Sequence, residues 1–78
     1  MKSIIEKLLF QNEYNSENIE SIKCALEEAC EHYSDSRDVT VEILGSEVEI
    51  YGISDPDQLA VIYEYAYSII RMKYSEVL

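Results

Sequence analysis

The residues that could bind a metal or catalyse a reaction are few and widely separated. The only histidine, His32, follows Glu28 by four residues, so the two side chains share a face if this stretch is helical. One imidazole and one carboxylate are fewer than the three or four ligands of a protein zinc site. A histidine near the end of a helix is stabilised there by the helix dipole, which is the simpler interpretation. We therefore predict no metal site at His32.

The two cysteines also have a simple structural interpretation. Cys24 and Cys30 are six residues apart on a predicted helix and point to different sides, so they cannot reach the Cα separation that a disulfide needs. Neither belongs to a CxxC motif. We interpret both as small, mostly buried apolar residues in reduced form, which is usual in the cytosol. Together with the lack of a secretory signal and of an apolar run of ~20 residues, this predicts a cytoplasmic protein without a membrane span.

No other motif indicates catalysis or cofactor binding. The chain has two glycines, too few for a phosphate-binding loop. No serine lies in a recognisable arrangement with the histidine and an acid. A chain of 78 residues also leaves little room for a deep pocket of the usual enzyme size. We expect no cofactor and no catalytic site, and a protein that is not an enzyme. A small-ligand sensor with a pocket under a sheet has no support in the sequence.

The acidic residues are the most informative polar groups. The net charge is −10, and residues 39–57 carry five acids and no base. A protein without a basic patch cannot release counterions from a phosphate backbone, which argues against direct binding to nucleic acid. The same charge attracts basic surfaces of other proteins. We therefore expect a basic protein partner.

Residues 39–44 and 47–51 alternate between apolar and polar side chains and are separated by Gly45-Ser46. A two-residue link that begins with glycine is typical of a hairpin with a type II′ turn. This turn fixes the register. The predicted inner pairs are Val39–Gly52, Val41–Ile50 and Ile43–Val48. The predicted outer pairs are Thr40–Tyr51, Glu42–Glu49 and Leu44–Glu47.

The outer face of this hairpin has two open interpretations. Glu42 directly opposite Glu49 is unfavourable, since like charges that face each other destabilise a sheet. The face can be a solvated acidic surface that keeps an exposed hairpin from aggregating. It can also be a docking surface for a basic partner, with Tyr51 as an aromatic contact. A divalent cation is disfavoured, because no loop of the calcium-binding type is present. The predicted contact set is Glu42, Glu47, Glu49 and Tyr51, with Glu27, Glu28 and Glu31.

Three stretches have helical periodicity. Ser3 and Glu6 form a capping-box pattern before a short helix. A polar turn at Gln11–Ser16 precedes a second helix that ends near Tyr33, followed by a loop at Ser34–Asp38. The third helix is predicted to run from Asp55, with Gln58 completing a capping box, to the last residue, Leu78. Its core stripe is Leu59, Ile62, Tyr63, Ala66, Ile69, Ile70 and Val77.

The order helix, helix, strand, strand, helix predicts a two-layer α+β fold in one domain, residues 1–78. A two-stranded hairpin is not stable alone, so we expect it to pack on the long C-terminal helix. That helix has a second apolar set, Val61, Tyr65 and Met72, opposite its core stripe. A helix that is apolar on two faces can offer one of them to a partner, and a two-fold homodimer is the simplest assembly.

Two functions follow from these features. The first is a small acidic interaction protein that engages a basic, nucleic-acid-binding partner, as an inhibitor, an immunity protein or an anti-defence protein. Its carboxylates would act as a nucleic-acid mimic by occupying a groove that receives phosphates. The alternative is a structural or oligomerisation module that associates through its C-terminal helix, in which the acidic residues only provide solubility.

Overall fold

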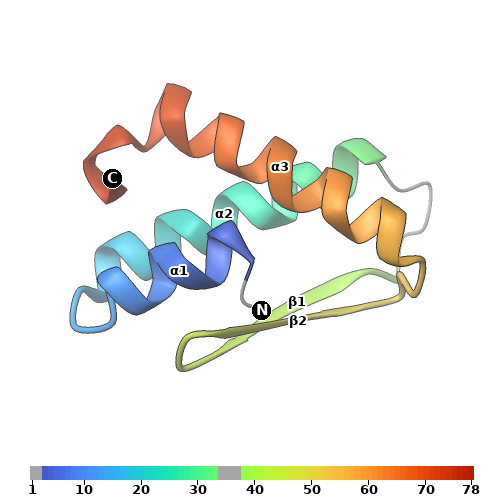
Figure 1. The fold of residues 1–78 in the computed structure, drawn as a ribbon, viewed down its shortest axis with the longest axis horizontal. Helices are drawn as coiled ribbons and strands as arrows, with labels where there is room; N and C mark the ends of the chain where they lie inside the picture. Colours follow the sequence, from blue (N-terminus) through green and yellow to red (C-terminus); the bar gives the residue numbers. More distant parts are fainter. Residues whose placement is uncertain (1–2, 34–37) are drawn as a thin grey trace.

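The computed structural model describes residues 3–33 and 38–78, and these form a small α+β fold. Its elements are α1 (Ile4–Gln11), α2 (Ser16–Tyr33), β1 (Thr40–Leu44), β2 (Glu47–Tyr51), α3 (Pro56–Lys73) and the 3-10 turn η1 (Ser75–Val77). The predicted element order and fold class are confirmed. In Figure 1 the hairpin forms the lowest tier, α1 and α2 lie above it, and α3 crosses the top. Most of the predicted loop at Ser34–Asp38 lies outside the described residues.

Helix α1 begins at the predicted capping box. The Ser3 hydroxyl accepts a hydrogen bond from the Glu6 backbone N–H at 3.2 Å, and the Glu6 carboxylate accepts one from the Ser3 N–H at 3.1 Å. These two bonds satisfy backbone groups that the first helical turn leaves unpaired. The helix buries Ile5, Leu8 and Leu9, which share one face. The local sequence therefore determines both the start and the orientation of α1.

The turn after α1 is connected to the far end of the chain through one side chain. The Asn12 amide nitrogen donates hydrogen bonds to the carbonyl oxygens of Leu8, at 2.8 Å, and Val77, at 3.1 Å. Its amide oxygen accepts a hydrogen bond from the Asn18 side chain at 2.8 Å. Asn12 thus joins α1, the start of α2 and η1.

The hairpin has the predicted register. Five of the six predicted pairs form: Thr40–Tyr51, Val41–Ile50, Glu42–Glu49, Ile43–Val48 and Leu44–Glu47. The predicted pair Val39–Gly52 lies just beyond the two strands, which begin at Thr40 and end at Tyr51. Gly45 has φ +64°, whereas Ser46 does not have a positive φ, as a type II′ turn requires. At the other end, Gly52 has φ +100°, and a Cβ atom there would lie 2.9 Å from the Asp38 carbonyl oxygen. Both glycines therefore occupy positions that disfavour a side chain.

Helix α3 begins where predicted, with Asp55 as its cap, but it differs from the prediction in the role of Gln58 and in its end. The Asp55 side chain caps it by accepting a hydrogen bond from the Asp57 N–H at 3.0 Å. Gln58 does not complete a capping box, because its amide donates to the Tyr33 carbonyl oxygen at 2.8 Å and joins α3 to the end of α2. The helix ends at Lys73 instead of Leu78, so its 18 residues span ~27 Å. The chain then turns through η1, which buries Val77 and brings its carbonyl to Asn12.

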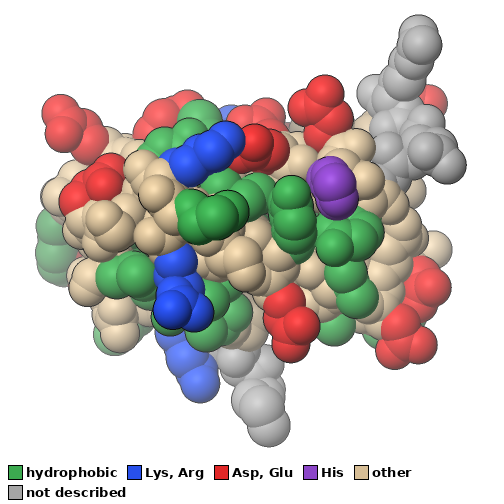
Figure 2. All heavy atoms as spheres, turned by 90° about the horizontal axis from the view of Figure 1, so that it is seen from above, with side chains coloured by type: hydrophobic (Ala, Val, Ile, Leu, Met, Phe, Trp, Pro, Cys, Tyr) green, Lys and Arg blue, Asp and Glu red, His purple; other side chains and the backbone are tan. Residues whose placement is uncertain are grey.

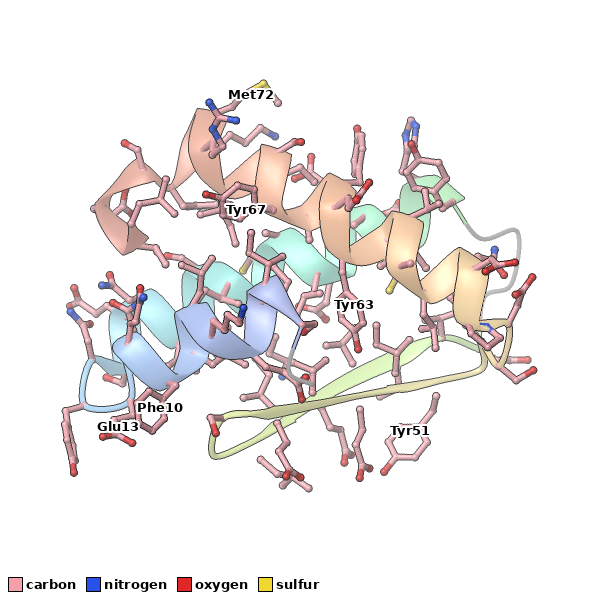
Figure 3. The ribbon with its side chains drawn as sticks, in the orientation of Figure 1. Phe10, Glu13, Tyr51, Tyr63, Tyr67 and Met72 are labelled. Atoms are coloured by element: carbon pink, nitrogen blue, oxygen red, sulfur yellow. The ribbon has the colours of Figure 1, made fainter. Side chains whose placement is uncertain are left out.

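The core lies between the three helices and the inner face of the hairpin. α3 packs mainly on α2, while β1 packs against α2 and β2 against α1. The cover over the hairpin therefore comes largely from α1 and α2, with Tyr63 pointing from α3 toward the sheet (Figure 3). The largest fully buried side chains come from all three helices: Ile5, Leu9, Ile22, Leu26, Ile62 and Ile70. In the described part of the chain, no helix is long and apolar enough to cross a membrane.

Candidate protein-interaction surfaces

The outer face of the hairpin carries the predicted acidic cluster. Glu42, Glu47 and Glu49 are all exposed, and Glu42 lies directly opposite Glu49. Tyr51 is 49% exposed on the same face and points away from the helices, at the lower edge of the molecule (Figure 3). We call these four residues the hairpin acidic face. The structure brings them together as the alternation of the strands predicted.

A hydrogen bond links two members of this face. The Tyr51 hydroxyl donates to the Glu49 carboxylate, two residues away on the same strand. This hydrogen bond, and then the negative charge of Glu49, raise the pKa of Tyr51 above its ordinary value. The protonated phenol thus joins the Glu49 carboxylate on the surface of the hairpin.

No lysine or arginine within residues 3–33 and 38–78 forms a salt bridge with the three carboxylates of this face. The salt bridge found in this part of the chain joins Lys73 to Glu28, at 2.9 Å, between α3 and α2. Because glutamates that face each other without a cation repel, the hairpin acidic face carries an unfavourable electrostatic energy. A cation supplied by another molecule would reduce it.

The predicted contact set does not form one surface. Glu28 is paired with Lys73, and together with Glu31 it lines a shallow depression between α2 and α3, where His32 and Tyr65 also lie. The hairpin lies on the other side of the helical layer (Figure 1). Glu27 is exposed on α2. The α2 glutamates are therefore separate from the hairpin acidic face, which spacing along the sequence could not reveal.

The second apolar set of α3 is partly used within the fold. Val61 is 43% exposed and Met72 is 74% exposed. Tyr65 is half-buried, because its ring stacks on His32 with centroids 4.7 Å apart and contacts Tyr33 edge-to-face at 5.1 Å. Figure 2 shows this side of the molecule, with His32 beside a band of hydrophobic side chains and basic residues next to them. Of the three predicted residues, Val61 and Met72 offer the most surface to a partner.

An open groove runs between the start of α1 and the middle of α3. Its lining is mostly apolar and includes Ile4, Tyr63 and Tyr67. Burial, and then the charge of Glu6, raise the pKa of the Tyr63 hydroxyl. The groove lies on the helices α1 and α3 and not under the hairpin.

The two cysteines are free and differ in accessibility. Cys30 is buried as predicted, whereas the predicted burial is wrong for Cys24, which is exposed. Burial, and then the charge of Glu27, raise the pKa of the Cys30 thiol, which lowers its thiolate fraction at neutral pH. Within the described residues, no group of three or more His, Cys, Asp or Glu side chains could hold a metal ion.

Sequence reasoning missed one exposed aromatic residue. Phe10 is 57% exposed near the end of α1 (Figure 3). Its position offers a signal, since Ile5, Leu8 and Leu9 already define the buried face of α1. At about 100° per residue, Phe10 lies ~140° from Ile5 and ~160° from Leu8 around the helix axis, so it falls outside that face.

Comparison with known proteins finds no relative for this chain: no family model, no curated protein and no solved structure matches it. The two surfaces above therefore supply the basis for a functional proposal.

Proposed function

We propose that this protein is a small acidic interaction module that binds a basic protein partner through the hairpin acidic face. The observation that carries the proposal is the pair Glu42–Glu49, two exposed carboxylates held directly opposite each other with no described cation beside them. Such an arrangement costs free energy in the isolated protein and is relieved when a cationic group lies between the two carboxylates. The proposal is a binding function without catalysis.

The rest of the face fits this proposal. Tyr51 offers a large side chain with a polar tip, the combination enriched in protein interfaces. Its hydrogen bond to Glu49 orders that carboxylate before binding, which reduces the entropy lost in the complex. The net charge of −10 would accelerate encounter with a basic surface.

The chemistry of the partner follows from the same groups. Closely spaced carboxylates on a protruding edge resemble the phosphates of a nucleic-acid strand in charge, and arginine binds both groups through paired hydrogen bonds. We propose a nucleic-acid-binding protein as the partner, with this chain acting as an inhibitor, immunity or anti-defence protein. The proposal includes a cytoplasmic location, which the two free cysteines support.

The test is affinity capture from the host lysate at low and high salt, with three forms of the protein. The wild type is compared with Glu42→Lys/Glu49→Lys and with Glu13→Lys/Glu17→Lys. The control pair makes the same charge change at exposed positions outside the hairpin. We expect the hairpin variant to lose the captured protein and the control variant to retain most of it.

The captured protein is then purified and titrated, and a short DNA or RNA duplex is added as a competitor. Displacement by the duplex supports phosphate mimicry. If the hairpin variant and the control variant bind the captured protein equally well, only the total charge of the protein matters, and the hairpin acidic face is not the contact surface. If salt has no effect on capture, electrostatic docking is wrong.

A second candidate function is supported by a different observation, the exposure of Val61 and Met72 on α3. In this function the chain is a structural module that associates with a second copy through α3, and the acidic residues provide solubility. The two functions use opposite sides of the molecule (Figure 1), so they can be tested separately.

A further inference from the structure

The outward side of α3 has an ordered distribution of apolar and charged residues. Ile62, Ala66 and Ile69 are buried, so the opposite side of the helix faces outward. Ser68 lies near the middle of that outward side, four residues after Glu64, whose backbone carbonyl accepts its hydroxyl at 3.2 Å. A serine at this position has a short side chain, which would let a second helix approach closely.

Two stripes flank Ser68. Because an α-helix turns by about 100° per residue, Val61 and Met72 lie on the flank nearer α2. Tyr65 extends this apolar flank to His32, on which it stacks. Glu64 and Arg71 lie on the other flank, two turns apart. Of these five flanking residues, Tyr65 is half-buried and the other four are exposed.

Neither Glu64 nor Arg71 forms a salt bridge within the described chain. They are seven residues apart, so their charges occur on one flank at opposite ends of the outward side. This arrangement of opposite charges is self-complementary only when the two copies of α3 run in opposite directions.

In a parallel pair with the two-fold axis along the helices, each flank meets the other flank of the partner. Glu64 and Arg71 would then lie against the apolar flank of the second copy, where neither charge meets an opposite charge. In an antiparallel pair related by a two-fold axis, each flank meets the same flank of the partner in reversed direction. Glu64 then faces Arg71 of the second copy, and the symmetry repeats the pair.

The apolar flank agrees with the same alignment. The pair Val61–Met72 is centred between residues 66 and 67, and the pair Glu64–Arg71 between residues 67 and 68. The two centres differ by one residue, or ~1.5 Å along the helix. One antiparallel register therefore satisfies both flanks, with Met72 covering Val61 of the second copy.

We infer that the protein forms a two-fold symmetric homodimer in which the α3 helices pack antiparallel, with reciprocal Glu64–Arg71 ion pairs beside reciprocal Val61–Met72 contacts. This inference rests on the second candidate function, association through α3, and adds its direction and register. It does not depend on the hairpin acidic face.

The dissociation constant of the dimer is measured by sedimentation velocity for four proteins: wild type, Glu64→Arg, Arg71→Glu and the double charge swap. Each single reversal replaces two attractive contacts with two repulsive ones, so we expect it to weaken the dimer by ~tenfold or more at low salt. The double swap restores opposite charges and should recover most of the wild-type affinity. Lys7→Glu, on exposed α1, is the matched control for Arg71→Glu and should leave the dimer unchanged.

Cross-linking then tests the direction. In a Cys24→Ser background, a chain with Val61→Cys is mixed with a differently tagged chain with Met72→Cys and oxidised. Predominant disulfides between the two different chains support the antiparallel register.

Three results would overturn the inference. A monomer up to millimolar concentration would reject both the register and association through α3. A dimer that ignores the charge reversals would reject the register, and association through α3 would then stand only if Met72→Lys breaks that dimer. Predominant Val61→Cys homodisulfides would show a parallel pair.

Discussion

Removal of one charge from the hairpin acidic face should make the isolated protein more stable. The informative change is Glu42→Gln, because Glu42 lies opposite Glu49 and forms no hydrogen bond with Tyr51, which binds Glu49 instead. Glutamine keeps the length and polarity of the side chain. The substitution therefore removes the charge and leaves the strand pairing and the Tyr51 contact in place.

The magnitude follows from the register. Side chains directly opposite each other on antiparallel strands start ~5 Å apart. Two unit charges at that distance in water repel by about 0.8 kcal/mol. At physiological salt, with a Debye length of about 8 Å, roughly half of this remains. We therefore expect Glu42→Gln to raise the free energy of unfolding by about 0.4 kcal/mol at physiological salt and by about 0.8 kcal/mol at low salt.

The assay is urea unfolding followed by circular dichroism, at ionic strengths from about 10 mM to about 1 M. This range covers weak and strong screening of the charges by salt. Glu13→Gln is the control, since it removes the same charge from an exposed turn and reports the effect of net charge alone. The gain of Glu42→Gln over this control should shrink as salt is added. A gain that equals the control, or one that is independent of salt, would refute the electrostatic reasoning for the facing pair.

Three further substitutions or reactions test the fold. Gly52→Ala should destabilise the protein by roughly 1–3 kcal/mol, since the backbone of Gly52 has φ +100° and a carbonyl oxygen would lie 2.9 Å from the new Cβ atom. Gly45→Ala should cost only about 1 kcal/mol, because Gly45 has φ +64° and open space around it. Equal losses of stability in thermal unfolding would contradict this difference. A thiol-reactive dye at pH 8 should label exposed Cys24 quickly and Cys30 only slowly, because burial restricts access and raises the Cys30 pKa, so that its thiolate fraction increases only at higher pH. Two equally fast thiols would mean that Cys30 is accessible. Ser3→Ala should cost ~1 kcal/mol through loss of the α1 cap, measured by urea unfolding, and no loss would show that α1 starts without the cap.

Sequence reasoning succeeded where the determinants are close together in the chain. The hairpin register required only the Gly45-Ser46 turn and the alternation around it, so Glu42 could be placed opposite Glu49 without a structure. The start of α1 required only Ser3 and Glu6. The hairpin acidic face was therefore predictable residue by residue.

It failed where a residue has a partner far away in the chain. Gln58 suits a capping box, yet its amide reaches the carbonyl oxygen of Tyr33. After α3 ends at Lys73, the chain turns back and the Val77 carbonyl oxygen accepts a hydrogen bond from Asn12, 65 positions away. Propensity favours a continuing helix there, and tertiary contacts override it. Helical periodicity also says nothing about the neighbouring helix, so the stacking of the Tyr65 ring on His32 could not be predicted from the sequence.

The division of the glutamates has the same origin. Glu28 and Glu31 looked equivalent to the hairpin glutamates in a count of charge along the chain. The packing of α3 on α2 gives Glu28 a lysine partner and places both residues on the helical side. Charge density along a sequence indicates how acidic a region is, but only the three-dimensional arrangement shows which acids share a surface.

The hairpin and α3 occupy opposite sides of the molecule, with Tyr51 at one extreme and Met72 at the other (Figure 3). A dimer joined through α3 would therefore present two acidic hairpins pointing in opposite directions. The two hairpins could bridge separate copies of a basic protein. They could also bind two adjacent subunits of one oligomer, when the distance between the hairpins matches the distance between the binding sites. In the second case the second contact forms at a high effective concentration, and avidity can exceed the affinity of one hairpin by about 10²–10⁴-fold without any new contact. A weak hairpin contact would then be sufficient for tight capture.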